Sequence, residues 1–144
     1  MEKVKILLEK DLRTQVASAG RLLVTDAPRA ISGLGEFFSP TDLLAISVAS
    51  CMLTMMGYKA KELKIDLAGS YMQLTKEMQL APIRRLKFIG IEFFCPRAFS
   101  TIITQQLIQA AEGCPVIHSL HPEIRKKVIY HWEGKSEVQS GDCI

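Results

Sequence analysis

Apolar residues follow two different periods along the chain, and their order predicts an α+β fold. Strict alternation around Ile6 indicates a strand with one buried face. A change of phase near Gly69 indicates a bulge or a bend in the extended stretch that surrounds it. The other periods predict extended segments at 14–17, 22–25, 65–80, 85–94 and 127–132, and helices at 40–56 and 99–112. Because no linker or repeat interrupts this order, residues 1–144 are expected to form a single domain.

The segment after Ser39 carries the strongest helix signal. Ser39 is a good N-cap, Pro40 suits the first helical position, and Asp42 places an acid in the first turn. The next sixteen residues, Leu43 to Tyr58, carry no charge, and crossing a bilayer takes about 20 residues, so we interpret this segment as a buried helix. Its apolar side chains point in nearly every direction, whereas one sheet covers only one side. We therefore expect a second copy of the chain to cover the other side, in an obligate homodimer.

Composition and charge indicate an ordinary globular domain. The chain has 48% hydrophobic and 23% charged residues with a net charge of +3, and its basic residues are scattered. Neither nucleic acid nor a membrane is expected as a partner, and the basic groups at 84–85 and 125–127 are interpreted as solvated strand ends. The charged first residues lack an apolar signal-like region, which makes the cytoplasm the expected location.

Two of the four cysteines are candidates for redox chemistry. Cys114 precedes Pro115, which suits the first position of a short helical turn, so the helix dipole is expected to lower the pKa of this thiol. Cys51 lies on the predicted helix beside a mildly polar stripe, which consists of Ser47, Ser50 and Thr54. If the two thiols meet, one can attack an oxidant while the other resolves the resulting sulfenic acid. Cys95 ends a buried strand and Cys143 lies in the tail, so both are weaker candidates.

Two motifs together resemble the OsmC/Ohr superfamily, the osmotically inducible protein C and organic hydroperoxide resistance proteins. They are Ser-Pro-Thr-Asp-Leu-Leu-Ala-Ile-Ser-Val-Ala-Ser-Cys at 39–51 and Cys-Pro-Val at 114–116, and the order of elements agrees over essentially the whole chain. The resemblance implies an α+β fold in which two subunits intertwine. Long central helices are then enclosed by antiparallel sheets from both subunits.

The same resemblance implies a thiol peroxidase that reduces organic hydroperoxides without a metal or other cofactor. Cys51 falls on the peroxidatic cysteine and Cys114 on the resolving one, and an external dithiol restores both thiols. In such an enzyme a fixed positive charge favours the thiolate and polarises the peroxide oxygen.

The supporting charges of the family match this chain less closely. The carboxylate of well-studied members falls at Thr41, and the nearest acid is Asp42, one residue later. Among three candidate arginines we favour Arg13, because a turn between strands presents it, over Arg21 and Arg29. The expected catalytic set is therefore Cys51, Cys114, Arg13 and Asp42.

Two other functions remain open from the sequence. Cys114, His118 and His121 have a C-x3-H-x2-H spacing that could hold zinc, with Cys51 as the fourth ligand. Alternatively, methionines could line a binding site for an apolar small molecule in a non-enzymatic dimer. These methionines are Met52, Met55, Met56, Met72 and Met78.

Overall fold

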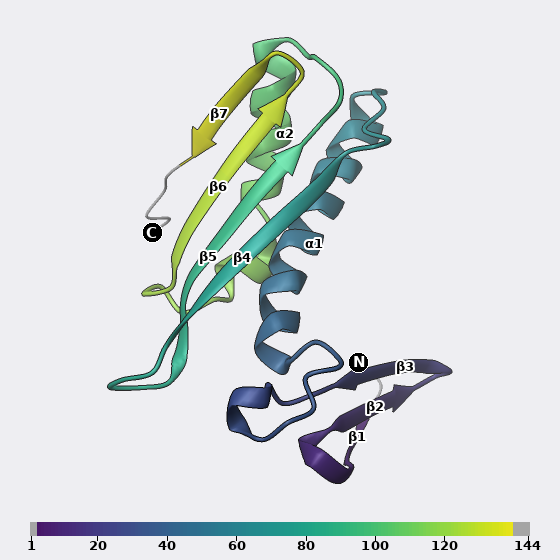
Figure 1. The fold of residues 1–144 in the computed structure, drawn as a ribbon. Coiled ribbons are helices and arrows are strands. Elements are labelled where there is room, and N and C mark those ends of the chain that lie inside the picture. The colour runs from purple at the N-terminus through teal and green to yellow at the C-terminus, as the bar shows by residue number, and fades with distance from the viewer. Residues whose placement is uncertain (1–2, 140–144) are drawn as a thin grey trace. The chain divides into compact units, whose positions relative to one another are not determined.

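The computed structural model describes residues 3–139 and divides the chain into two compact units. The N-terminal unit extends to Leu44 and the C-terminal unit begins at Ala45, within a helix that both units share. The elements, labelled in Figure 1, are β1 (Lys5–Leu8), β2 (Thr14–Ser18), β3 (Arg21–Thr25), α1 (Pro40–Glu62), β4 (Tyr71–Gln79), β5 (Arg85–Phe94), α2 (Thr101–Glu112), α3 (Pro115–His118), β6 (Arg125–Trp132) and β7 (Lys135–Gln139). This mixture of two sheets and three helices confirms the predicted α+β class, while the single-domain expectation stays a prediction.

The N-terminal unit contains an antiparallel sheet in the order β1-β2-β3. Ala19 and Gly20 turn the chain from β2 to β3 with φ angles of 48° and 76°, as a tight hairpin requires. The prediction of a buried face is wrong for β1, because all four of its residues are exposed and Leu8 is 74% exposed. Three short strands form a single layer. The apolar side chains of this sheet therefore have no second layer of the same sheet against which they could be buried.

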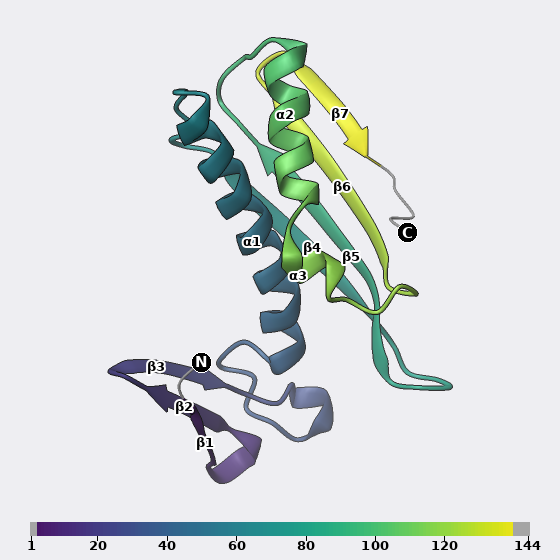
Figure 2. The ribbon, with the colours of Figure 1, turned by 180° about the vertical axis from the view of Figure 1, so that it is seen from behind.

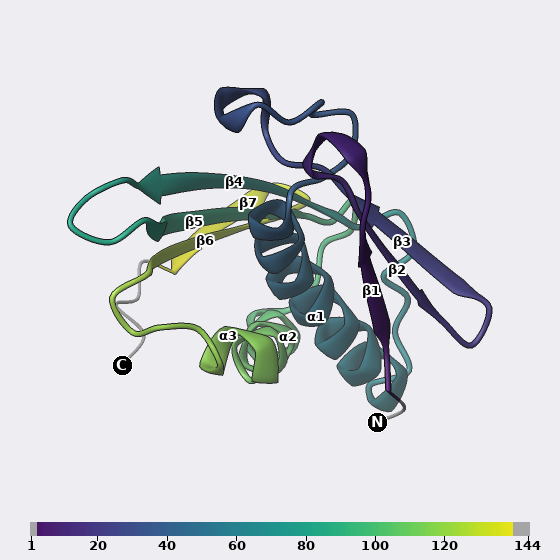
Figure 3. The same ribbon diagram turned by 90° about the horizontal axis from the view of Figure 1, so that it is seen from below.

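The C-terminal unit contains a four-stranded sheet in the order β4-β5-β6-β7. The outer pairs are antiparallel, whereas β5 and β6 are parallel. A parallel pair needs a crossover connection, which α2 and α3 provide (Figure 2). Both α2 and the part of α1 that belongs to this unit lie against the same face of the sheet (Figure 3).

The core of the C-terminal unit lies between these helices and the sheet. The strands contribute alternate residues, with Phe93 and Tyr130 fully buried. The buried side chains of α1 recur every three or four residues and are Ala45, Val48, Ala49, Met52, Met56 and Ala60. Within one chain α1 is therefore buried on one face, and Tyr58 on another face is 61% exposed. By length and composition alone α1 could also span a membrane, a property that core helices of soluble proteins share.

Some local boundaries agree with the sequence and others do not: α1 continues to Glu62 beyond the predicted end at 56, and β4 begins at Tyr71 although the extended segment was expected from 65. β5 covers the predicted range, and α2 ends at Gly113 as expected. Of the bulge or bend predicted near Gly69, the bend is confirmed: this residue lies in a turn before β4 with a φ of 84°, whereas the register shift of the strand falls between Glu77 and Met78. Strand β7 was not predicted, because its polar sequence carries little apolar alternation.

Candidate active site

Cys51 lies in the middle of α1 and is half-buried against the core of the C-terminal unit. Its neighbours on the helix include Ser50 and Thr54, which belong to the mildly polar stripe. The Thr54 hydroxyl donates to the Ser50 carbonyl at 2.9 Å, so this part of the stripe satisfies itself within the helix. Cys51 is therefore positioned by a rigid helix and faces largely apolar surroundings.

Cys114 lies where the chain passes from α2 to α3. Its backbone N–H donates to the Ala111 carbonyl at 3.1 Å, which completes the end of α2. It is also the N-cap residue of α3, with Pro115 at the first helical position as predicted. Its side chain is fully buried, so this thiol is closed to solvent.

The fold brings the two candidate thiols together. Although 63 positions separate them in the sequence, the Cys114 side chain hydrogen-bonds Cys51, and both cysteines are free thiols. Burial, and then the contact with Cys51, raise the pKa of Cys114. The backbone N–H groups of Val116 and Ile117 favour the thiolate but do not outweigh these two effects. The expectation that the helix dipole lowers this pKa is therefore wrong in sign, and Cys114 is a protonated thiol that can donate to the Cys51 sulfur.

Arg13 forms the centre of a charged cluster in the N-terminal unit. Its Nε and Nη2 atoms donate to the two carboxylate oxygens of Asp26 at 2.7 and 2.9 Å. Nη2 also donates to Glu36 Oε2 at 2.6 Å, and the guanidinium carbon lies 4.7 Å from the centre of the Phe37 ring. These contacts fix the guanidinium in one orientation and raise the pKa of Arg13, so its charge is permanent.

Asp26 is a fully buried carboxylate whose hydrogen bonds are satisfied on several sides. Besides Arg13, the backbone N–H groups of Glu36 and Phe37 donate to its Oδ2 atom at 2.9 and 3.2 Å. The Arg13 hydrogen bond, helped by these backbone donors, lowers the pKa of Asp26 to about 2 despite its burial. Asp26 thus joins the start of β2, the end of β3 and the segment that leads into α1.

The sequence reasoning missed Asp26 and Glu36, although the register of the β2–β3 hairpin contained a signal. Thr14 lies opposite Thr25, and their hydroxyl oxygens are 2.6 Å apart. Continuing this register by one residue places Arg13 opposite Asp26. A two-residue turn recognised at 19–20 would therefore have indicated the pair.

Asp42 is engaged at the N-terminus of α1. Its Oδ2 accepts hydrogen bonds from the Ser39 backbone N–H at 2.8 Å and from the Ser39 hydroxyl at 2.6 Å. The Asp42 N–H in turn donates to the Ser39 hydroxyl at 3.2 Å, and the hydroxyls of Ser39 and Thr41 are 3.1 Å apart. This reciprocal pattern is a capping box, and it gives Asp42 a structural reason to be present.

The other candidate residues lie elsewhere. Arg29 donates from Nε to the Leu34 carbonyl at 3.0 Å, and Arg21 is exposed at the start of β3. Cys95 is buried just after β5, where its N–H donates to the His131 carbonyl at 2.9 Å. Cys143 lies outside the described residues.

The predicted zinc site is not assembled. Within residues 3–139, no three His, Cys, Asp or Glu side chains come together as metal ligands. His121 Nδ1 lies 3.3 Å from Arg85 Nη1 and accepts the Glu123 N–H at 3.2 Å, while His118 is exposed at the end of α3. The zinc alternative with Cys114, His118 and His121 as ligands is therefore wrong, because the Nδ1 atom of His121 lies next to the Arg85 guanidinium.

The structure is therefore that of an α+β protein in which a buried thiol lies next to a second thiol. Comparison with known proteins identifies its family. The family model described as OsmC-like protein matches residues 33–128, so the chain belongs to the OsmC-like family. No curated protein sequence matches the chain.

Solved structures agree with this assignment. A protein of Psychrobacter arcticus named for osmotic stress induction and detoxification is 41% identical, with a TM-score of 0.85 over 91% of this chain and 96% of that chain. An OsmC-like protein of Mycoplasma pneumoniae is 17% identical, with a TM-score of 0.75 over 90% and 95%. A Legionella pneumophila chain that carries the name organic hydroperoxide resistance protein OsmC is 18% identical, with a TM-score of 0.66 over 90% and 95%. The last two similarities support the fold alone.

Proposed function

We propose that the protein is a thiol-dependent peroxidase that reduces organic hydroperoxides. The observation that carries the proposal is the contact between Cys51 and Cys114, two free thiols with different access to solvent. Membership in the OsmC-like family, which includes proteins named for organic hydroperoxide resistance, supports the same reaction.

In the first step the Cys51 thiolate attacks one peroxide oxygen and the O–O bond breaks. The terminal oxygen, with its hydrogen, stays on the sulfur, so that Cys51 becomes a sulfenic acid, and the oxygen that carries the organic group takes up the proton that the Cys51 thiol released and leaves as an alcohol. The Cys114 thiol then attacks the sulfenic sulfur, so that a disulfide forms and water leaves. An external dithiol supplies two electrons and two protons, restores both cysteines and becomes a disulfide itself.

The difference in burial supports this division of roles. Cys51 is half-buried, so it is the thiol that a peroxide or a reductant can reach. Cys114 is fully buried and held as a protonated thiol, so it is suited to react only with its neighbour. The apolar surroundings of Cys51 favour a hydroperoxide with an organic group over hydrogen peroxide.

Arg13 is our candidate for the fixed positive charge of the reaction. A guanidinium favours the thiolate over the thiol and stabilises negative charge on the oxygen as the O–O bond breaks. The support is its permanent charge and its fixed orientation between Asp26 and Glu36. Asp42 caps α1, and its place in the expected catalytic set stays a prediction.

We further propose that the protein acts as an intertwined homodimer in the cytoplasm. The N-terminal sheet exposes large apolar side chains, with Ile6 66% and Leu22 64% exposed, and α1 is buried on one face only. A second copy that covers both surfaces would account for them. Sedimentation at micromolar concentration tests this, and a stable folded monomer would overturn the dimer.

The peroxidase is tested by mass spectrometry of free thiols before and after one equivalent of cumene hydroperoxide. We expect a Cys51–Cys114 disulfide within seconds, while Cys95 stays reduced. Cys114→Ser should stop at the sulfenic acid, which dimedone traps on Cys51. If both thiols of the wild-type protein stay reduced for minutes, the peroxidase proposal fails and binding of an apolar ligand becomes the better hypothesis.

A further inference from the structure

The hairpin between β4 and β5 ends in an apolar tip. Leu80 is 76% exposed, more than any other large apolar side chain in residues 3–139, and Ile83 is 64% exposed. The Gln79 side-chain amide donates to the Ile83 carbonyl at 3.3 Å and helps to shape the loop between them. Both side chains therefore project from a shaped turn in which neither is buried.

Basic residues follow the hairpin behind this tip and form what we call the hairpin basic patch. They come from β5, the residue before it, and the adjacent start of β6, where Phe88 pairs with Arg125 and Gly90 with Lys127. The patch consists of Arg84, Arg85, Lys87, Arg125, Lys126 and Lys127.

The charge of the patch is only slightly neutralised by nearby acids. Arg85 forms an ion pair with Glu123, and Arg125 lies 5.8 Å from the centre of the Phe88 ring. Arg84, Lys87 and Lys127 are exposed. The six cations lie near two acids, Glu123 and Glu77, of which Glu77 lies opposite Phe88 in β4, so this end of the C-terminal sheet carries a surplus of positive charge, although the whole chain has a net charge of only +3.

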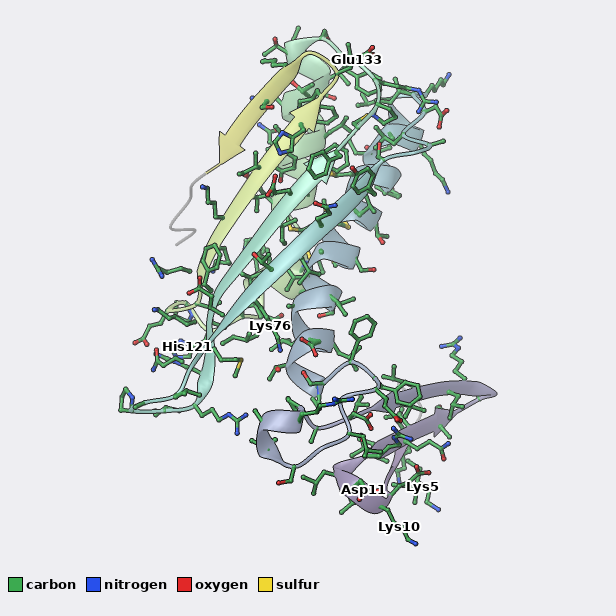
Figure 4. The ribbon with its side chains drawn as sticks, in the orientation of Figure 1. Lys5, Lys10, Asp11, Lys76, His121 and Glu133 are labelled. Atoms are coloured by element: carbon green, nitrogen blue, oxygen red, sulfur yellow. The ribbon has the colours of Figure 1, made fainter. Side chains whose placement is uncertain are left out.

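The patch and the tip lie at one end of the C-terminal unit. Within this unit the hairpin extends beyond α2, α3 and the start of β6 in both side views (Figures 1 and 2). His121 lies at the same end, whereas Glu133 lies at the far end, between β6 and β7 (Figure 4). The tip can therefore approach a flat surface ahead of the rest of the unit.

We propose that this hairpin docks the protein on an anionic phospholipid bilayer. Leu80 and Ile83 enter the boundary between headgroups and acyl chains, and the hairpin basic patch contacts the lipid phosphates. This differs from the solvated strand ends expected from the sequence, because scattered basic residues gather only when β5 and β6 pair. The combination favours a bilayer over nucleic acid, which gains nothing from two aliphatic side chains at the protruding end of the contact. It also disfavours a second copy of the same surface, because two such patches repel each other.

Sedimentation with vesicles tests the proposal. We expect binding to mixed phosphatidylglycerol and phosphatidylcholine vesicles but not to pure phosphatidylcholine, with weaker binding at high salt. Reversing two charges in Lys126→Glu/Lys127→Glu should lower partitioning about tenfold or more. The matched control, Lys61→Glu/Lys64→Glu, changes the net charge equally at the end of α1 and should bind much better than the patch variant.

The apolar tip is tested separately. Leu80→Ser/Ile83→Ser should reduce vesicle binding several-fold, whereas Ile102→Ser, at a residue that is 73% exposed on α2, should not. In a Leu80→Trp variant the added fluorescence should shift to the blue on anionic vesicles and be quenched by brominated lipid.

Three results would overturn the proposal. One is equal binding of the patch and control variants to vesicles. Another is tight binding to an oligonucleotide that the charge reversal abolishes and the tip variant leaves intact, with no vesicle binding. A third is a change of oligomeric state in Leu80→Ser/Ile83→Ser, which would place the tip between copies of the chain. None of these results depends on peroxidase activity.

Discussion

Asp26 in the N-terminal unit and Cys114 in the C-terminal unit are both fully buried acids, yet their pKa values shift in opposite directions. Asp26 receives two hydrogen bonds from a guanidinium and two from backbone N–H groups, and its pKa falls to about 2. Cys114 receives only backbone N–H groups and touches another thiol, and its pKa rises. Burial alone therefore does not decide whether these two acids are protonated. The charged Arg13 donor at Asp26 accounts for the opposite direction of its pKa shift.

The same contrast separates the two units. The C-terminal unit is organised by an apolar core in which a neutral thiol causes no electrostatic penalty. The N-terminal unit buries little of its sheet and is held instead by the Arg13–Asp26 pair and by backbone hydrogen bonds to the carboxylate. Each unit therefore contains one of the residues proposed for the reaction, Cys51 in the C-terminal unit and Arg13 in the N-terminal unit.

Removal of Cys51 should have the largest effect. Cys51→Ser is expected to lower the rate of hydroperoxide consumption by more than about 10³-fold, because no other thiol replaces the nucleophile. Cys114→Ser should keep the first oxidation and lose disulfide formation, which a stopped-flow assay followed by thiol mass spectrometry separates. If Cys51→Ser retains full activity, the division of roles between the two thiols is wrong.

Removal of the guanidinium tests whether the N-terminal unit contributes to the chemistry. Arg13→Gln should slow oxidation of Cys51 by about 10²-fold, the usual loss when one stabilising donor is removed. Arg29→Gln is the matched control, since Arg29 donates to a backbone carbonyl and should leave the rate nearly unchanged. Equal rates in both variants, with folded proteins by circular dichroism, would remove Arg13 from the mechanism.

Core truncations should distinguish how the two units are stabilised. Met52 is fully buried in α1, so Met52→Ala should cost about 2 kcal/mol or slightly more. Leu8 is 74% exposed in one chain, so Leu8→Ala should have a small effect on unfolding but should weaken the proposed dimer. Urea unfolding at several protein concentrations measures both effects. A large loss for Leu8→Ala that does not depend on concentration would contradict this assignment.

The sequence predicted the C-terminal unit better than the N-terminal one, for a physical reason. β5 and α2 bury apolar faces within the chain, so their periodicity is strong and their bounds were predicted closely. In β1 the same alternation occurs without a buried face, because the described residues of this unit form no second layer over it. Periodicity indicates that a face is apolar, but not which chain covers it.

The candidate site was predicted to a similar, partial extent. The motifs predicted Cys51 and Cys114, which the structure brings into contact, and the turn before β2 predicted Arg13, whose role stays a prediction. The partners of Arg13 were not found, because Asp26 and Glu36 meet it only through hairpin register and loop closure. The sign of the Cys114 pKa shift was also missed, since burial and the contact with Cys51 are tertiary properties.

The lowered pKa of Asp26 predicts a loss of stability in acid. A carboxyl group whose folded pKa is below its unfolded value stabilises the fold above the unfolded value, near 4, and this contribution disappears as the pH falls toward about 2. Asp26→Asn should therefore be less stable than wild type at pH 7, and the difference should shrink between pH 4 and pH 2. Asp66→Asn, which removes an exposed pair with Arg97, is the control and should show little change. If urea unfolding shows the same stability difference between wild type and Asp26→Asn at pH 4 and at pH 2, Asp26 does not titrate as proposed.

The raised pKa of Cys114 predicts the opposite behaviour at alkaline pH. Above the ordinary thiol value of 9.0 the unfolded chain releases the Cys114 proton while the folded chain retains it, so stability falls as the pH rises. The Cys114→Ala variant lacks this linkage, and its stability should decline less steeply than that of the wild type between pH 8 and about 10. Urea unfolding under a strong reductant measures the difference, with Cys95→Ala as a second thiol control. If the two curves decline in parallel, the buried thiol loses its proton as readily as an exposed one, and the contrast with Asp26 fails.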